Sequence, residues 1–273
     1  MSSVTRGIRE SSVTVDGSRQ IFMSEKRADG SEIPVLFLNS LAADLTMWDD
    51  VRGRLGARTV AFDARGHGRS DVVPGGADLD GFADDAAAVM DAAGIDRAVL
   101  CGLSLGGLTA MSLAGRMPDR VLGLVLANTA VSFPPAQMWR ERADTARNGS
   151  FPKLVQPTLE RWLTPGFREA QPTVAAEVRR MIASTPAEGY AAACAVLERG
   201  DARKALSAFA GPVLAIAGQH DQSTPVARAE EIADISQNGE LLVIDAAHLT
   251  AVERAEEFAA ALQGFLERVG PDG

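Results

Sequence analysis

The stretch Gly102-Leu103-Ser104-Leu105-Gly106 decides the fold of this chain. It follows the apolar run 98–101, which predicts a short buried strand, and it precedes residues 107–117, which predict a helix that ends before Pro118. A turn this tight between a strand and a helix needs glycine on both sides, because a Cβ atom there would clash with the crossing backbone. We therefore expect Ser104 to be strained, with its hydroxyl exposed above a sheet edge beside the N–H groups of a helix N-terminus.

A serine hydroxyl attacks a carbonyl at neutral pH when a base removes its proton and an acid orients that base. The chain has three histidines, so the choice of base is narrow. We assign the base to His248, which follows the apolar run 241–244 and precedes a closing helix predicted over residues 253–269. We assign the acid to Asp221, which follows the apolar run 213–217. Both residues lie where predicted strands end, the edge at which open α/β sheets place their sites.

The other two histidines have different expected roles. His67 stands close in sequence to Asp63 and Arg65, which indicates a local network that shapes a loop. His220 adjoins Asp221, so we expect its side chain to point away from the acid. A serine in a glycine-rich turn, or a histidine on a loop, is usually structural when it occurs alone. Their joint placement at strand ends favours catalysis.

Length, composition and charge restrict the class of protein. The 273 residues, of which 46% are hydrophobic, fit one α/β domain with a small insertion. The formal net charge of -9 argues against nucleic acid and anionic membranes as partners, because both are polyanions. The sequence shows neither a signal peptide nor a run of about 18 apolar residues, so we expect a cytoplasmic protein. We expect no metal and no cofactor, and the sequence leaves the oligomeric state open, a homo-oligomer included.

Strands that alternate with helices predict an α/β fold with a mostly parallel sheet flanked by helices on both faces. We expect this core to comprise residues 1–130 and 206–273. Its predicted elements are strands over 35–38, 59–62 and 121–127, a helix over 78–93, and turns at Asp16-Gly17 and Asp29-Gly30.

Residues 131–205 break this pattern, since no strand-like run occurs among them. They include two of the three tryptophans, the single tyrosine and many arginines. We predict a helical cap over residues 131–205, inserted into the sheet, which would cover the serine, shape an acyl pocket and exclude water. The alternative is a helical excursion on the surface that packs on its own tryptophans.

Three stretches carry a resemblance to known proteins: Asn39-Ser40-Leu41, Asp63 to Ser70, and Cys101 to Thr109. The chain resembles the α/β-hydrolase superfamily over nearly its whole length, and more narrowly the 3-oxoadipate enol-lactonases of bacterial aromatic degradation. The order Ser104, Asp221, His248 is the order of that superfamily. The pair Asn39-Ser40 is the narrower signal, because most of the superfamily has His-Gly there. The other matching segments are Met47-Trp48, Leu126 to Ala130, Trp139 with Arg142, Arg161-Trp162, and Glu188 to Ala191 with Cys194.

The resemblance implies a mechanism and a set of site residues. It implies hydrolysis of a small anionic lactone through an acyl-enzyme on Ser104, with an enol as leaving group. The backbone N–H groups of Leu41 and Leu105 would form the oxyanion hole. Trp139, Arg142, Arg161 and Trp162 would bind substrate. Of these, Arg142 is the first candidate to pair with the substrate carboxylate, and Trp139 would form an apolar wall.

The sequence departs from the enol-lactonase pattern at two positions and leaves other functions open. Ala42 stands where the enol-lactonases usually have glycine, and Leu105 where they usually have methionine. The cap arginines can also be solvated helix charges. The remaining alternatives are a general carboxylesterase, a lactonase for another ring, a cofactor-free haloperoxidase-like hydrolase, and a non-catalytic receptor that binds a small lactone.

Overall fold

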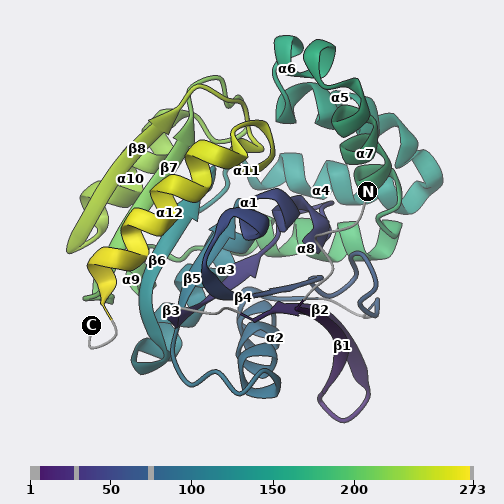
Figure 1. Cartoon of the computed structure of the whole chain (residues 1–273). Coiled ribbons are helices and arrows are strands. Elements are labelled where there is room, and N and C mark those ends of the chain that lie inside the picture. The colour runs from purple at the N-terminus through teal and green to yellow at the C-terminus, as the bar shows by residue number, and fades with distance from the viewer. Residues whose placement is uncertain (1–6, 28–30, 73–76, 271–273) are drawn as a thin grey trace.

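The computed structural model describes residues 7–27, 31–72 and 77–270. Its centre is an eight-stranded sheet in the order β1-β2-β4-β3-β5-β6-β7-β8 (Figure 1). β2 pairs antiparallel with both β1 and β4, and β3 to β8 run parallel. This confirms the predicted, mostly parallel sheet. The strands are β1 (Ile8–Val15), β2 (Arg19–Lys26), β3 (Ser31–Leu38), β4 (Ala57–Phe62), β5 (Ala98–Leu103), β6 (Val121–Ala127), β7 (Pro212–Gly218) and β8 (Asn238–Ile244).

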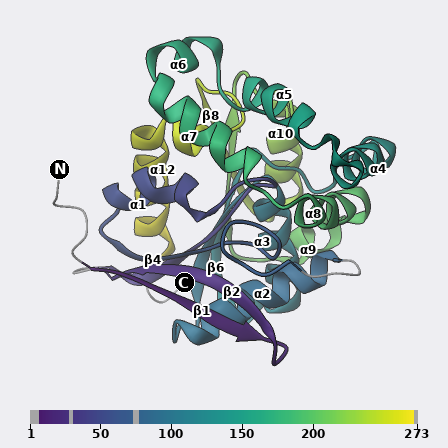
Figure 2. The same cartoon turned by 90° about the vertical axis from the view of Figure 1, so that its right-hand side faces the viewer.

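Helices cover both faces of the sheet, as predicted (Figure 2). The short helices η1 (Leu45–Trp48), η2 (Pro118–Arg120) and α11 (Thr250–Glu253) lie in the connections. One face carries α1 (Asp49–Arg54) and α12 (Ala255–Val269), and the other carries α2 (Leu79–Ala92), α3 (Leu105–Arg116), α9 (Arg203–Ala208) and α10 (Val226–Ile235). Because the central strands are covered twice, β5 and β6 are buried along their whole length, which explains their unbroken apolar sequences.

Helix α2 shows how the sequence builds one of these layers. Asp78 caps its N-terminus, since the Asp78 side chain accepts a hydrogen bond of 2.8 Å from the N–H of Gly81. The large apolar side chains Phe82 and Met90 are buried on the face of the helix that turns toward the protein interior. The helix predicted over residues 78–93 is confirmed.

The predicted turn at Asp16-Gly17 joins β1 to β2. Asp16 and Gly17 both have positive φ, at 52° and 73°. That geometry matches the right-handed twist of the two antiparallel strands. The turn predicted at Asp29-Gly30 lies outside the described residues.

The chain between β6 and β7 forms the helices that lie over one end of the sheet (Figure 1). They are α4 (Ala136–Thr145), the π-helical turn η3 (Ala146–Ser150), α5 (Pro152–Trp162), α6 (Pro165–Ala170), α7 (Pro172–Ala183) and α8 (Ala187–Arg199). Ser132 and Asp201 form an isolated antiparallel bridge, and the Ala202 N–H donates to the Val131 carbonyl at 2.8 Å. We call residues 131–202 the cap. Helix α9 spans the expected boundary at residue 205 and packs against α3 of the core.

Within the described ranges, no helix is long and apolar enough to cross a bilayer.

The turn between β5 and α3 brings two backbones very close together. A Cβ atom on Gly106 would lie 2.1 Å from the carbonyl oxygen of Leu38 in β3, and one on Gly102 would lie 2.4 Å from the carbonyl oxygen of Gly106. Only glycine fits at both positions, because backbone atoms cannot move aside as a flexible side chain can.

Gly106→Ala is therefore expected to lower the free energy of unfolding by about 3 kcal/mol, measured by urea unfolding. Gly53→Ala is the matched control. Gly53 lies inside helix α1, where an added Cβ atom meets nothing within 4 Å. That change should stabilise the protein by up to about 1 kcal/mol through helix propensity. Equal effects of the two substitutions would contradict the close approach at Gly106.

Candidate active site

Ser104 lies between β5 and α3 in a conformation that L-residues rarely adopt, with φ 56° and ψ −114°. Neighbouring elements hold this conformation. The N–H of Ser104 donates to the Ala127 carbonyl at 3.0 Å, and its carbonyl accepts from the Thr129 hydroxyl at 2.6 Å and from the Leu108 N–H at 3.1 Å. A strained residue costs about 1–3 kcal/mol and persists where its surroundings fix it. The strand, turn and helix lie where the pentapeptide predicts them, but the predicted exposure of the serine is wrong, because Ser104 is buried.

Asp221 and His248 meet across the ends of β7 and β8. His248 Nδ1 lies 2.7 Å from Asp221 Oδ2, and both side chains are buried. A carboxylate oxygen only accepts, so Nδ1 of His248 carries the proton and Nε2 is left as the basic nitrogen. Burial raises the pKa of Asp221, but the adjacent His248 and the hydrogen bonds from His248, Thr224 and Asn128 outweigh it and hold that pKa below its usual value. Asp221 is thus set to remain an anion beside the imidazole.

Asn128 is a site residue to which the sequence analysis assigned no role. It follows β6, and its amide group donates to Asp221 Oδ2 at 3.0 Å and to the Ala247 carbonyl at 3.2 Å. Its own oxygen accepts from the Thr250 hydroxyl at 2.6 Å. The side chain therefore joins the acid to the chain on both sides of His248. The sequence could have indicated this role, because Asn128 directly follows a predicted central strand, at the edge of the sheet where sites lie.

The turn after β3 is fixed by Asn39. The Asn39 amide donates to the Phe62 carbonyl at 2.8 Å, and its oxygen accepts from the Trp48 indole N–H at 2.9 Å. Both groups of this buried amide are thus satisfied. Asn39 therefore has a structural role in this turn, since its side chain bonds the end of β4 and the indole of Trp48.

The two predicted oxyanion donors lie at turns beside Ser104. Leu105 is the first residue of α3, where the first backbone N–H groups have no partner within the helix. Leu41 lies in a turn closed by the Ala43 N–H, which donates to the Ser40 carbonyl at 3.2 Å. Ala42 takes the third position of this turn with φ 62°, a value that favours glycine.

A cavity of about 230 Å³ lies between the cap and the strand ends. Ser104, His248 and Leu41 contribute to its floor. The cap contributes all four residues that the sequence analysis named for substrate binding, which are Trp139, Arg142, Arg161 and Trp162. The segment is therefore not a separate surface excursion, because its side chains share one cavity with Ser104.

Arg142 and Arg161 come from different helices and converge inside this cavity. Arg142 donates to the Tyr190 hydroxyl at 2.8 Å, and both arginines lie near the Thr158 hydroxyl, at 3.4 Å for Arg142 and 3.3 Å for Arg161. Neither arginine forms an ion pair with a carboxylate of the described chain. Two half-buried cations that form no ion pair within the described residues leave a site for a negatively charged ligand.

The electrostatics of nearby groups agree with this picture. Burial lowers the pKa of Arg161, and the positive charge of Arg142 lowers it further. Burial raises the pKa of Tyr190 to about 12, so its phenol is neutral. An anion bound between the arginines would relieve their mutual repulsion.

The model of the α/β hydrolase fold family matches residues 33–255. The chain belongs to this family. It is 34% identical over 236 residues to 3-oxoadipate enol-lactonase 2 of Acinetobacter baylyi, which covers 86% of this chain and 88% of the relative. Among solved structures it is similar to the enol-lactonase from Burkholderia xenovorans, with a TM-score of 0.90, 32% identity and coverage of 94% of this chain and 100% of the other. It is also similar to a malate-bound thermophilic esterase from Thermogutta terrifontis, with a TM-score of 0.88, 30% identity and coverage of 96% and 99%.

These similarities confirm the predicted membership in the α/β-hydrolases and the narrower resemblance to enol-lactonases. They support hydrolysis of an ester or lactone bond. In the part of this α/β-hydrolase that the structure describes, no group of three His, Cys, Asp or Glu residues could hold a metal ion.

The two remaining histidines of this α/β-hydrolase lie away from the cavity. His67 is fully buried, and its Nδ1 lies 3.1 Å from the Arg65 carbonyl. His220 is exposed, and its Nε2 lies 2.8 Å from Asp245. Its side chain thus diverges from Asp221, as predicted.

Ala42→Gly is expected to raise the free energy of unfolding by about 0.5–1 kcal/mol. Alanine at φ 62° is strained, and the relief of that strain exceeds the greater chain entropy of glycine in the unfolded state. Urea unfolding of the two proteins measures the difference. A clear loss of stability would mean that the buried methyl group of Ala42 stabilises the fold by packing more than its backbone strain destabilises it.

Proposed function

We propose that this protein hydrolyses a small enol-lactone that bears a carboxylate, converting 3-oxoadipate enol-lactone to 3-oxoadipate through an acyl-enzyme on Ser104. The pair of cap arginines carries this proposal. Arg142 and Arg161 lack a described carboxylate partner, and they line the same cavity as Ser104 and His248. In a chain of net charge -9, an anionic substrate needs such a local cationic site.

Acylation begins when His248 takes the proton of the Ser104 hydroxyl through Nε2. The serine oxygen then attacks the ring carbonyl of the lactone. The N–H groups of Leu41 and Leu105 donate hydrogen bonds to the oxyanion that forms. Asp221 stabilises the imidazolium, to which it is already bonded through Nδ1 at 2.7 Å.

The ring opens when the bond between the carbonyl carbon and the ring oxygen breaks. His248 returns its proton to the leaving enolate, and the enol becomes the ketone of 3-oxoadipate. An enolate is a better leaving group than an alkoxide, so the intrinsic barrier to acylation is modest. His248 then takes a proton from water, which attacks the carbonyl carbon of the acyl-enzyme. The bond from that carbon to the Ser104 oxygen breaks, His248 returns the proton to this oxygen, and the second carboxylate is released.

The comparisons support this choice of substrate class. Matched relatives include enol-lactonases, and the similar Thermogutta terrifontis esterase was solved with malate, a small dicarboxylate. The cavity of about 230 Å³ suits a ligand of this size.

The direct test is hydrolysis of 3-oxoadipate enol-lactone generated in situ, followed by the loss of its ultraviolet absorbance. Rapid turnover with a specificity constant well above that for neutral esters is the expected result. Preference for neutral esters would instead indicate a general carboxylesterase. Binding of the lactone without turnover would indicate a receptor.

Ser104→Ala is expected to reduce turnover more than about a thousandfold, because it removes the nucleophile. His248→Ala should reduce it similarly, since no other base faces the cavity among the described residues. His220→Ala is the control and should leave turnover close to that of the wild type, because His220 is exposed and paired with Asp245. Circular dichroism checks that each variant folds. A dead His220→Ala beside an active His248→Ala would show that the base was assigned wrongly.

Arg142→Ala should lower the specificity constant for the carboxylate-bearing lactone by about thirtyfold, which corresponds to about 2 kcal/mol for one lost charge-assisted pair. Hydrolysis of a neutral ester should change little. Arg140→Ala is the matched control on the same helix, since Arg140 is exposed and pairs with Glu198. Equal losses on both substrates would assign Arg142 to support of the cap. No loss on either would move carboxylate binding to Arg161.

A further inference from the structure

Glu253 is a buried carboxylate with no part in the reaction proposed above. It lies at the end of α11, five residues after His248, and is 5% exposed. It accepts hydrogen bonds from the Ala247 N–H at 3.0 Å, from the Thr164 N–H at 3.3 Å and from the Thr164 hydroxyl. Ala247 belongs to the loop that carries His248, and Thr164 belongs to the cap. One carboxylate thus binds both segments.

The residues on both sides of His248 are held by the cap. Ala247 is held through Glu253, and the Leu249 N–H donates directly to the Trp162 carbonyl at 3.0 Å. Cap residues 162–164 therefore hold the histidine backbone together with Asn128 of the core, which bonds Ala247 and Thr250.

The same cap segment also lines the cavity. Arg161 and Trp162 face the cavity, and they immediately precede Leu163 and Thr164 in the chain. The Trp162 ring lies 6.1 Å from the His248 ring, with their planes tilted by 33°. Any shift of residues 161–164 would therefore move the Arg161 guanidinium and, at the same time, the hydrogen bonds that hold the His248 loop.

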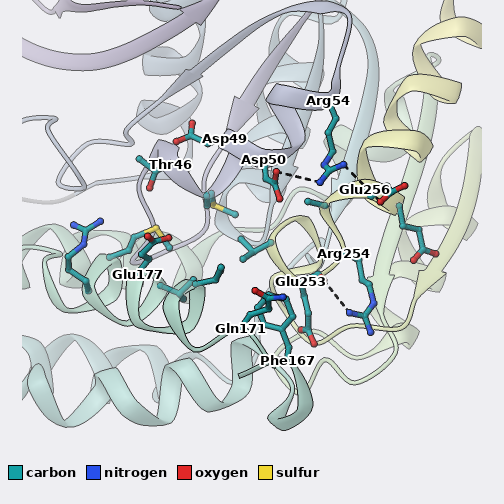
Figure 3. A pocket seen from close by; sticks show the side chains of 18 of the residues that line it. Thr46, Asp49, Asp50, Arg54, Phe167, Gln171, Glu177, Glu253, Arg254 and Glu256 are labelled. Atoms are coloured by element: carbon teal, nitrogen blue, oxygen red, sulfur yellow. Dashed lines mark hydrogen bonds and ion pairs between the residues drawn. The ribbon is translucent and has the colours of Figure 1, made fainter. Parts of the chain in front are cut away.

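A cleft separates the cap from the core on the other side of Glu253 (Figure 3). Its volume is about 1110 Å³, and its walls come from α7 of the cap and from α1, α11 and α12 of the core. Glu253 lines this cleft together with Phe167 and Gln171 of the cap. Glu253 therefore lies between this cleft and the His248 loop, where its hydrogen bonds connect the cap to the core.

We propose that Glu253 is a positioning residue that ties cap residues 161–164 to the His248 loop, so that substrate binding at the cap and alignment of the base depend on each other. This inference rests on the proposed function of the site. The chemistry of the carboxylate suits the task, because it has two acceptor oxygens and no donor, and all three of its partners donate. Glutamine at this position would turn an N–H group toward one of those donors.

Glu253→Gln is the first test, with a neutral ester and the carboxylate-bearing lactone as substrates. We expect kcat for the neutral ester to fall about tenfold, and KM for the lactone to rise as well, because Arg161 moves with the segment. Glu257→Gln is the matched control, since Glu257 is exposed on the neighbouring helix α12. Wild-type kcat for the neutral ester in Glu253→Gln overturns the proposal.

A double-variant cycle tests whether Glu253 acts through its bonds to Thr164 or whether the two residues stabilise the cap independently. Thr164→Val removes only the hydroxyl on the cap side, and Thr164→Ser retains it together with its hydrogen bond to the Phe167 N–H at 3.3 Å. If Glu253 connects the two segments, Thr164→Val lowers kcat for the neutral ester and raises KM for the lactone, as Glu253→Gln does, and Thr164→Ser keeps both at wild-type values. The double variant then loses no more than Glu253→Gln alone. Losses that multiply in the double variant overturn the proposal. Should Glu253→Gln fail to fold, Thr164→Val against Thr164→Ser decides the question.

A spectroscopic measurement makes the outcome independent of the substrate. The proton shared by His248 Nδ1 and Asp221 should give a far-downfield proton NMR signal. We expect this signal to shift or broaden in Glu253→Gln and to stay unchanged in Glu257→Gln. An unchanged signal in Glu253→Gln contradicts the inference. Failure of the wild type to hydrolyse the lactone would instead contradict the proposed function and leave the NMR result valid.

Discussion

A buried negative charge on Asp221 organises the carboxyl edge of this sheet. An isolated carboxylate at such depth would be neutralised, so its charge persists only with donors around it. Those donors come from the chain after β6, β7 and β8: Asn128, the Ser223 and Thr224 N–H groups, the Thr224 hydroxyl, and His248. The charge therefore fixes three strand ends relative to one another. The tautomer of His248 follows from the same requirement, because one ring nitrogen must donate to the acid.

The net charge of the protein is opposite in sign to the charge of the arginines in its cavity. The chain carries net charge -9, yet the cavity beside Ser104 holds two arginines without described acidic partners. Long-range steering would oppose the approach of an anion, whereas short-range hydrogen bonds in the cavity would favour its capture. Affinity for such a substrate should therefore reside in contacts within the cavity, where ionic strength has less influence than at the surface.

The local pattern of the sequence was enough to predict much of the fold and part of the candidate site. Strand β6 coincides with the apolar run 121–127, because a strand that is buried on both faces has an unbroken apolar sequence. Helix α2 lies within the amphipathic stretch 78–93, because a helix that is buried on one face has apolar residues at helical spacing. Asn128 and Glu253 were missed, since their partners lie 93 and 89 residues away in Asp221 and Thr164. Convergence of Arg142 and Arg161 was equally hidden, because two helices of unknown orientation carry them. Helix α9, which contains the expected boundary at residue 205, packs on α3 of the core.

The bridge between Ser132 and Asp201 has a consequence for how such proteins can diversify. It pairs the outgoing chain after β6 with the returning chain before α9. The two ends of the insertion are thus held together by this bridge and by the hydrogen bond from Ala202 to Val131, whatever number of residues lies between them. Because the entropy of closing a loop grows only slowly with its length, the segment can lengthen, shorten or be exchanged at small cost to the sheet. The paired ends of the cap are thus a natural crossover point for recombination between relatives, at which a new cap could be joined to the same core if it keeps the contacts of residues 162–164 with the His248 loop.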